Sequence, residues 1–193
     1  PARRAEARDR CEPSQHMIHI RVATSLDHDD VRDIHLCAFP EGEKQIVSKL
    51  AVDLLNEETS PKTISLVAEA DGAVVGHIAF SPVTVNNNKN WTGYILAPLA
   101  VKPGYQKRRI GSKLVESGME RLSRMGVNVV FVYGDPKYYG KFGFSADLAS
   151  GYLPPYELQY PFGWQAITLN EDIISDSVVK ISCVFPLNDP ELW

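Results

Sequence analysis

The stretch of this chain that decides its fold begins Tyr94-Ile-Leu-Ala-Pro-Leu-Ala-Val-Lys-Pro-Gly-Tyr-Gln-Lys-Arg-Arg-Ile-Gly-Ser-Lys113. After an amphipathic run it ends Val129-Val-Phe-Val-Tyr-Gly-Asp-Pro-Lys-Tyr-Tyr-Gly-Lys-Phe-Gly-Phe144. The pattern predicts a strand, a basic turn with a glycine, a helix, a second strand and a tyrosine-rich turn. The first N–H groups of a helix have no partner within it and point outward, so a basic turn at a helix start suits a phosphate.

The composition is that of an ordinary globular protein. Of the 193 residues, 44% are hydrophobic and 23% are charged, so we expect one domain with a substantial core. The formal net charge of -4 does not favour nucleic acid or an anionic membrane as a partner, and no apolar run approaches the length of a membrane span. Residues 102–113, however, contain five lysines and arginines and no acid. This basic patch suits a small anionic ligand better than a long polyanion.

The cysteines indicate a reducing environment. Cys11, Cys37 and Cys183 are odd in number and have no paired spacing, so we expect no disulfide framework and a cytoplasmic location. Cys11 lies near His16 and His19, but a second pair of ligands is missing, so no metal site is predicted.

The first residues differ in character from the rest. Residues 1–16 are polar, contain four arginines and lack the apolar core of a signal peptide. They are a tag remnant, a processed tail or a true extension, and the sequence leaves these three readings open. We expect a single domain over residues 17–193.

Hydrophobic periodicity predicts an α/β protein of the α+β type. Apolar positions recur at helical spacing from Ile110, and Gly126 is placed to end that helix. We expect strands at residues 18–23, 63–70, 73–85, 91–101, 127–133, 165–169 and 178–184, helices at 31–39, 44–56 and from 110, a short helix or turn at 138–142, and a loop at 151–163. The strand–helix–strand unit predicts a crossover in a mixed sheet, where ligands gather at the C-terminal ends of parallel strands.

Proline 98 interrupts the strand expected at 91–101. Proline has no N–H to donate to a neighbouring strand, so we expect a bulge or a separation of the strands there. The basic turn that follows is neither a nucleotide P-loop nor a dinucleotide fingerprint, because the required glycines are absent. By spacing alone it is equally consistent with a solvated charged turn.

Two motifs resemble one family. Gln106-Lys-Arg-Arg-Ile-Gly-Ser112 is similar to the loop that binds the acetyl-CoA pyrophosphate in the GNAT N-acetyltransferase superfamily, with Gln106 at its first position and Gly111 at its last. Arg109 stands where that loop usually has its first glycine. The segment from Gly134 to Phe144 resembles the Tyr-x-x-x-Gly-Phe ending of the superfamily, and in particular of its YhbS-like branch of acetyltransferases. The resemblance covers about residues 17–170.

The resemblance implies a GNAT fold, with a mixed, mostly antiparallel sheet flanked by helices and a parallel strand pair splayed around acetyl-CoA. It implies transfer of an acetyl group to a primary amine, with the Leu99 N–H polarising the thioester carbonyl as part of the catalytic machinery. The acceptor is left open among a small amine, an amino-acid derivative, an antibiotic, and a protein terminus or lysine. The cofactor-binding residues that it implies are Leu99, Ala100, Val101, Gln106, Lys107, Arg108, Arg109, Ile110, Gly111, Ser112, Lys113 and Tyr138.

Tyr139 matches the family tyrosine that protonates the departing thiolate, since it lies four residues before Gly143. A phenol with a pKa of about 10 is a workable acid for a thiolate, although Tyr139 could instead serve only in packing. The general base is open. Glu41, Glu43 and Asp135 are candidates near the acceptor, each also compatible with a surface or capping role, and a water chain is the alternative.

Several readings stay open at this level. A catalytically weak acyl-CoA-binding sensor and a protein-interaction module on the same fold are the rival functions. The protein is expected to be a monomer or a homodimer. His77 and His35 are read as structural residues, and the aromatic segment between Tyr152 and Trp164 is either a wall of the acceptor pocket or a loop packed on the sheet.

Overall fold

The computed structural model describes residues 17–86, 88–172 and 177–193. The predicted tail of residues 1–16, with Cys11 and His16, lies outside this range, so the division into tail and domain stays a prediction. The strands are β1 (His19–Val22), β2 (Ile64–Ala70), β3 (Ala73–Val85), β4 (Gly93–Val101), β5 (Val129–Tyr133), β6 (Tyr152–Leu153), β7 (Trp164–Thr168) and β8 (Val179–Cys183). The helices are α1 (His28–Ala38), α2 (Lys44–Asn56), α3 (Ile110–Arg124), α4 (Pro136–Tyr139) and α5 (Ala146–Ala149).

The strands form one mixed sheet in the order β1-β2-β3-β4-β5-β7. Each neighbouring pair is antiparallel except β4 and β5, which are parallel. The far end of β3 extends beyond β2, and β8 pairs with it there through residues 181–183. The short strand β6 pairs with β8, also in parallel. The predicted mixed, mostly antiparallel sheet with a central parallel pair is confirmed.

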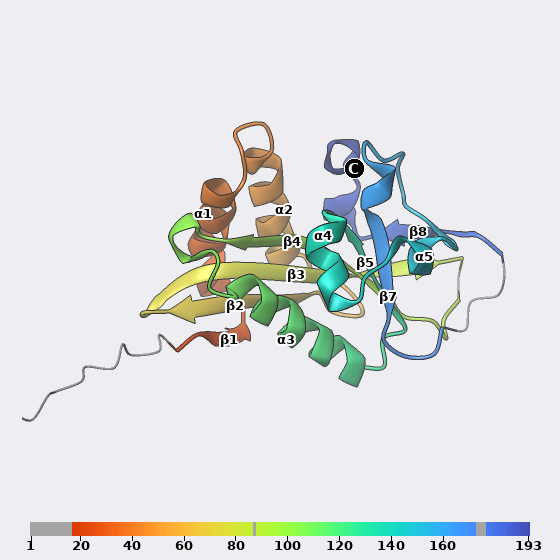
Figure 1. The fold of residues 1–193 in the computed structure, drawn as a ribbon, viewed down its shortest axis with the longest axis horizontal. Coiled ribbons are helices and arrows are strands. Elements are labelled where there is room, and N and C mark those ends of the chain that lie inside the picture. Colours follow the sequence, from red (N-terminus) through yellow and green to blue (C-terminus); the bar gives the residue numbers. More distant parts are fainter. Residues whose placement is uncertain (1–16, 87, 173–176) are drawn as a thin grey trace, which may run out of the picture.

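Helices cover both faces of this sheet (Figure 1). Helices α1 and α2 lie on one face and α3 on the other, with the C-terminal segment on the same side as α2. Side chains alternate along β4 as the pleat requires: Tyr94 and Leu96 join the core beneath α3, whereas Ile95 joins the core beneath α2. The sheet therefore separates two cores, and a pocket that crosses β4 touches both.

The element ends differ slightly from the predicted ones for local reasons. The first helix begins at His28 rather than Val31, after a 3₁₀ turn whose Thr24 and Asp27 form a reciprocal capping box. The strand expected from Val127 begins at Val129, because the Val127 N–H still bonds to the Leu122 carbonyl at the end of α3. The segment expected as a loop at 151–163 contains the two-residue strand β6.

Within the described residues, no helix has the length and apolar character needed to cross a membrane. Cys37 and Cys183 both carry free thiols.

Candidate functional site

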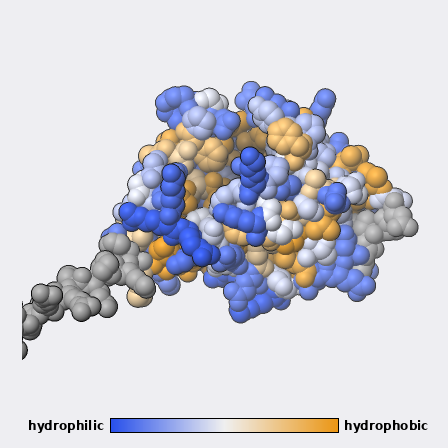
Figure 2. All heavy atoms as spheres, viewed as in Figure 1, coloured by the Kyte–Doolittle hydropathy of each residue, from blue (hydrophilic) through white to orange (hydrophobic). Residues whose placement is uncertain are grey.

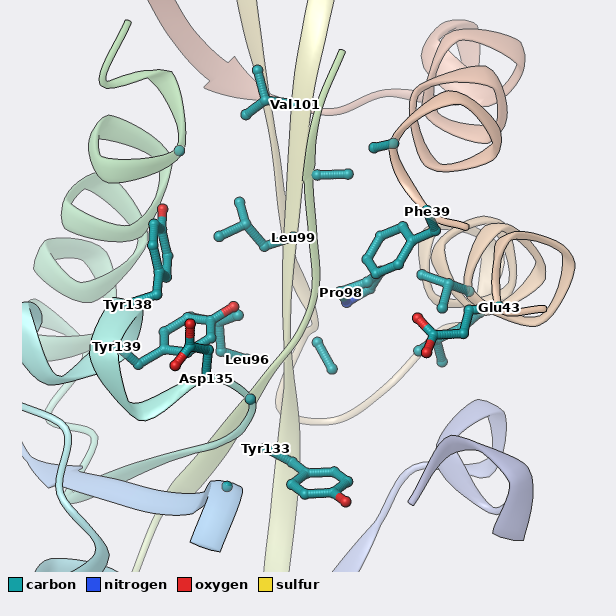
Figure 3. Close-up of a pocket in the computed structure, with 18 of the residues that line it drawn as sticks. Phe39, Glu43, Leu96, Pro98, Leu99, Val101, Tyr133, Asp135, Tyr138 and Tyr139 are labelled. Atoms are coloured by element: carbon teal, nitrogen blue, oxygen red, sulfur yellow. The ribbon is translucent and has the colours of Figure 1, made fainter. Parts of the chain in front are cut away.

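A pocket of about 1120 Å³ lies where β4 and β5 separate. Its walls come from the ends of these two strands, from the turn before α3, from α4, from the α1–α2 connection and from the last residues of the chain. Figure 3 shows Tyr138, Tyr139 and Asp135 on one side of β4, Phe39 and Glu43 on the other, and Tyr133 below them. The site predicted at the C-terminal ends of the parallel strands therefore coincides with a real cavity.

The separation of the strands begins at the predicted proline. Strands β4 and β5 are paired from Gly93 to Leu96, after which β4 continues to Val101 paired only with β3. On the other side of β4, Ala79 of β3 faces two residues of β4, Ala97 and Pro98. The expected bulge is confirmed, and it turns the end of β4 away from β5.

This geometry aims two backbone donors at the gap. The Lys102 N–H donates to the Val75 carbonyl on the β3 side of β4. N–H groups alternate in direction along a strand, so those of Leu99 and Val101 point to the side from which β5 has departed. Both residues line the pocket, as does Ala100 between them.

The turn before α3 leaves its helical amides open. Arg109 is the N-cap residue and no side chain caps the helix, whose first backbone bond runs from the Lys113 N–H to the Arg109 carbonyl. The N–H groups of Ile110, Gly111 and Ser112 are therefore available to an anion. The Gln106 side-chain amide donates to the Val101 carbonyl at 3.0 Å and ties the turn to the end of β4.

Arg109 adopts the conformation in which glycine would be easiest to accommodate. Its φ is 62° and its ψ is 16°, and Lys107 is also left-handed, with a φ of 61°. The backbone thus follows the path that a glycine would allow, at a steric cost that glycine would not have. Compared with the glycine of the family pattern, Arg109 adds backbone strain and a positive charge to this turn. The left-handed backbone conformation is the same as a glycine would adopt.

The basic side chains of the turn divide into two groups. Lys107 and Arg109 line the pocket, whereas Arg108 lies over the ring of Tyr105 at 5.4 Å and, like Lys113, is not part of the wall. Figure 2 shows hydrophilic residues gathered over the start of α3, beside a hollow with hydrophobic residues on its walls. The structure thus brings together ten of the twelve residues predicted for the cofactor.

Tyr138 lies directly over the start of α3. A Cβ atom on residue 111 would stand 2.7 Å from the Tyr138 hydroxyl, so only glycine fits there without a shift. Burial raises the pKa of Tyr138, and a hydrogen bond with the Ser112 side chain opposes that rise. Tyr138 therefore faces the turn at the start of α3.

Tyr139 points from α4 toward β4 beside Leu96 (Figure 3). Its ring packs edge-on against Phe144 and lines the pocket. Burial raises the pKa of the phenol, and nearby Tyr138 and Asp135 raise it further. The hydroxyl therefore stays protonated through the physiological range and remains a hydrogen-bond donor.

The three predicted carboxylates lie in different surroundings. Glu43 lines the pocket and its carboxylate points into it (Figure 3). Glu41 pairs with Lys44 at 2.5 Å and is not part of the wall. Asp135 lines the pocket beside Tyr139, but its Oδ1 accepts a hydrogen bond from the Lys137 N–H and caps α4. Of these three predicted carboxylates, only Glu43 lines the pocket without a side-chain role in a helix cap or in an ion pair of the described residues.

Several lining residues were missed by sequence reasoning. Phe39 follows α1, Tyr133 ends β5, and Glu191 and Trp193 belong to the last 3₁₀ turn. No local pattern marks Glu191 or Trp193, because only the tertiary fold brings that turn to α2. Of the aromatic segment, Tyr160 and Phe162 line the pocket, whereas Tyr152 is buried in the core.

The two histidines read as structural are indeed buried together. His35 Nε2 lies 2.8 Å from His77 Nδ1, and His77 Nε2 lies 2.7 Å from the Ser65 hydroxyl. Burial lowers the pKa of His35 to about 3 and the pKa of His77 well below its ordinary value. Neither ring lines the pocket. Among the residues that the structure describes, no group of three or more His, Cys, Asp or Glu side chains is arranged to hold a metal ion.

Comparison with known proteins gives consistent results. Residues 19–146 match the model of the acetyltransferase (GNAT) domain. Over 145 residues the chain is 34% identical to the uncharacterized N-acetyltransferase YjhQ of Escherichia coli K12, covering 74% of this chain and 78% of that one. It is 39% identical over 127 residues to the uncharacterized N-acetyltransferase YhbS of the same strain, covering 65% and 72%.

Two solved structures with bound ligands are similar throughout. The crystal structure of Escherichia coli YhbS in complex with CoA superposes with a TM-score of 0.77 at 26% identity, covering 90% of this chain and 93% of that one. A GNAT family acetyltransferase from Brucella melitensis in complex with acetyl-CoA gives a TM-score of 0.62 at 30% identity, covering 85% and 95%.

Proposed function

The chain belongs to the GNAT acetyltransferase family, and we propose that it transfers the acetyl group of acetyl-CoA to a primary amine by direct attack on the thioester. One observation carries this proposal. A single pocket joins the uncapped start of α3 to the gap where β4 leaves β5. Two proteins of similar fold have been solved in complex with CoA and with acetyl-CoA, which supports the proposal that this pocket binds acetyl-CoA.

The residues present fit acetyl-CoA. The amides from Ile110 to Ser112 are open to the pyrophosphate, and a side chain at position 111 would have to displace the Tyr138 hydroxyl that lies over this turn. Lys107 and Arg109 add positive charge at the pocket wall. We assign Arg108 and Lys113 a longer-range electrostatic role, since neither lines the pocket.

Acetyl-CoA supplies the activated acetyl group: the amine nitrogen bonds to the carbonyl carbon, the C–S bond breaks, and CoA leaves with a proton on sulfur. The N–H groups of Leu99 and Val101 point into the gap where the thioester carbonyl would lie. Fixed backbone donors of this kind stabilise negative charge as it develops on an oxygen. They need no reorganisation, because the bulge at Pro98 already holds them in place.

We assign the proton for sulfur to Tyr139. Its hydroxyl reaches toward β4, and its raised pKa keeps it protonated. The same raised pKa makes it a weaker acid than a free phenol. Its contribution therefore begins as a hydrogen bond to the sulfur, with proton transfer as the thiolate forms.

The amine must lose protons as it reacts, and Glu43 is the best placed of the predicted carboxylates to accept one, directly or through water. It faces the pocket from the side of β4 opposite Tyr139, so acid and base approach the reacting carbonyl from different sides. Glu41 is engaged with Lys44, and Asp135 caps α4.

The decisive test is a thiol-release assay over a panel of amines, combined with calorimetry using acetyl-CoA and CoA. Micromolar binding together with amine-dependent thiol release is the expected result. Binding without release would identify the acyl-CoA sensor instead. Absence of binding would leave only the interaction module and would overturn the proposal.

A further inference from the structure

The pocket carries opposite charges on its two sides. Lys107, Arg109 and Lys141 line it on the side of α3 and α4, where the polyanionic cofactor is proposed to lie. Glu43 and Glu191 line it on the side of α2 and the last turn. A protonated amine is attracted to the acidic side, and a second anion is repelled from it.

The walls around the two glutamates are apolar rings. Phe39, Tyr133 and Trp193 line the acidic side, and the rings of Tyr133 and Trp193 are nearly parallel, with 6.2 Å between centroids and an angle of 7°. Ring faces of this kind attract both apolar groups and cations. This side of the pocket therefore combines two carboxylates with the faces of aromatic rings.

The polar atoms of these rings are engaged within the protein. The Tyr133 hydroxyl accepts a hydrogen bond from the Tyr160 N–H at 2.7 Å, and the Trp193 indole N–H donates to the Leu187 carbonyl at 3.0 Å. These bonds hold the two rings in place. They use the single donor of the Trp193 indole, whereas the Tyr133 hydroxyl can still donate one hydrogen bond. A sugar-like acceptor would therefore leave most of its hydroxyls without partners on such a wall.

The apolar character continues to the rim of the pocket. Tyr160 and Phe162 both line it, with 52% and 68% of their surfaces exposed, and their ring centroids are 5.9 Å apart. Large rings left in water at the mouth of a pocket indicate a partner group that covers them. The acceptor thus needs an apolar body that extends from the glutamates toward this rim.

We propose that the acceptor is a small arylalkylamine: a primary amine on a short chain that ends in an aromatic ring, with no carboxylate. This inference rests on the proposed function and names the substrate class of that site. The ammonium group lies between Glu43 and Glu191 before it loses its proton, and the ring packs among Phe39, Tyr133 and Trp193. The corresponding α-amino acid is disfavoured because its carboxylate meets the same two glutamates.

The test uses matched acceptors with acetyl-CoA held constant: 2-phenylethylamine against ethylamine, 2-phenylethylamine against phenylalanine, and kanamycin and spermidine as polycationic references. Burial of the ring predicts a kcat/KM about 10- to 100-fold higher for 2-phenylethylamine than for ethylamine. Phenylalanine is expected to have a lower kcat/KM than 2-phenylethylamine when the two are compared at equal concentrations of the unprotonated amine. Higher kcat/KM for kanamycin, spermidine or phenylalanine than for 2-phenylethylamine would overturn the inference and leave the acetyltransferase function standing.

Variants of the two glutamates test the assignment within the pocket. The double variant Glu43→Gln/Glu191→Gln is expected to lower kcat for every acceptor, because the proposed base is lost, and to raise the KM for 2-phenylethylamine about three- to tenfold. Its advantage over phenylalanine in kcat/KM is expected to narrow, with the KM for acetyl-CoA unchanged. Glu57→Gln, at the opposite end of α2 and outside the pocket wall, is the matched control for loss of a negative charge. An unchanged preference between the two acceptors in the double variant would overturn the assignment.

Calorimetry separates this inference from the proposed function. In the presence of CoA, 2-phenylethylamine is expected to bind, and ethylamine to bind at least tenfold more weakly. If no amine is acetylated but this difference in binding is found, the proposed acetyltransferase function fails, whereas the inference that this pocket binds arylalkylamines stands. If neither amine binds, or both bind equally, the inference fails whatever the assay of turnover gives.

Discussion

The ring of Tyr139 packs on Gly134 so closely that a Cβ atom on residue 134 would stand 2.6 Å from Cε2 of the tyrosine. Gly134 directly follows β5, and Tyr139 lies at the end of α4. The missing side chain therefore decides how the phenol reaches toward β4. The position of the Tyr139 ring thus depends on Gly134, and separate substitutions at the two positions can test the position of the ring and the role of its hydroxyl.

Replacement of Tyr139 by Phe is expected to lower kcat by about 100-fold or more, with little change in the Kd for CoA. The hydroxyl is proposed to act on the departing sulfur, and loss of a general acid typically has an effect of this size. Steady-state thiol release and calorimetry with CoA measure the two quantities. Tyr138→Phe is the matched control, because it removes the same atom from the ring that faces Ser112. Equal losses of kcat in the two variants would argue against the assigned role.

Replacement of Gly134 by Ala is expected to reproduce much of the Tyr139→Phe defect without removing a polar atom. The added methyl group must displace the ring or the backbone, and such overpacking costs about 1–3 kcal/mol of stability. Urea unfolding measures the stability and thiol release the turnover. Gly140→Ala, where a Cβ atom has no neighbour within 4 Å, is the control. Wild-type turnover in Gly134→Ala would show that the position of Tyr139 is not critical.

Much of this arrangement could be predicted from the sequence. The strands are short apolar runs bounded by turn residues, and the bulge follows from one proline in a strand that must pair on both sides. The amides at the start of α3 follow from a basic turn before an amphipathic helix. These features depend on neighbours along the chain, which is why local patterns reveal them.

The acceptor side of the pocket could not be predicted in the same way. Glu43 and Glu191 line the same pocket although nearly 150 positions separate them in the sequence, and Trp193 joins them only because the last turn packs against α2 and Tyr133. Tertiary packing decides such relationships, and periodicity carries no information about them.

Replacement of Arg109 separates backbone strain from charge. Alanine keeps a side chain at a φ of 62°, whereas glycine accepts that conformation readily. We expect Arg109→Gly to be more stable than Arg109→Ala by about 1 kcal/mol in urea unfolding. Both variants lose a charge from the pocket wall, so both are expected to bind CoA several-fold more weakly than the wild type.

Arg108→Ala is the control for this pair, since the Arg108 side chain lies over Tyr105 rather than in the wall. Calorimetry with CoA should give a smaller loss of affinity for Arg108→Ala than for Arg109→Ala. The reverse order would indicate that CoA binding draws Arg108 into the pocket in place of Arg109.

The buried histidine pair predicts a loss of stability in mild acid. Both rings are fully buried, and His35 Nδ1 is a buried polar atom with no hydrogen-bond partner. The pKa of His35 is lowered to about 3 by burial. The pKa of His77 is lowered by burial and by its neighbour His35. In the unfolded chain each imidazole has an ordinary pKa of about 6.5, so the unfolded state binds more protons below that pH.

The sign of the effect follows from this difference. Stability from the neutral pair is fully present above pH ~6.5 and is lost as the pH falls toward the folded-state pKa, by up to about 1.4 kcal/mol per pH unit for each histidine. Urea unfolding between pH 5.0 and 6.5 isolates this window from most carboxylate titrations. His35→Gln is expected to be less stable at pH 7.5 but to show a shallower dependence on pH, because one titrating group has been removed. His19→Gln, which replaces an exposed imidazole on β1, is the matched control. If His35→Gln kept the wild-type slope across this window, the folded protein would have to protonate His35 as readily as the unfolded chain does, and the neutral buried pair would be disproved.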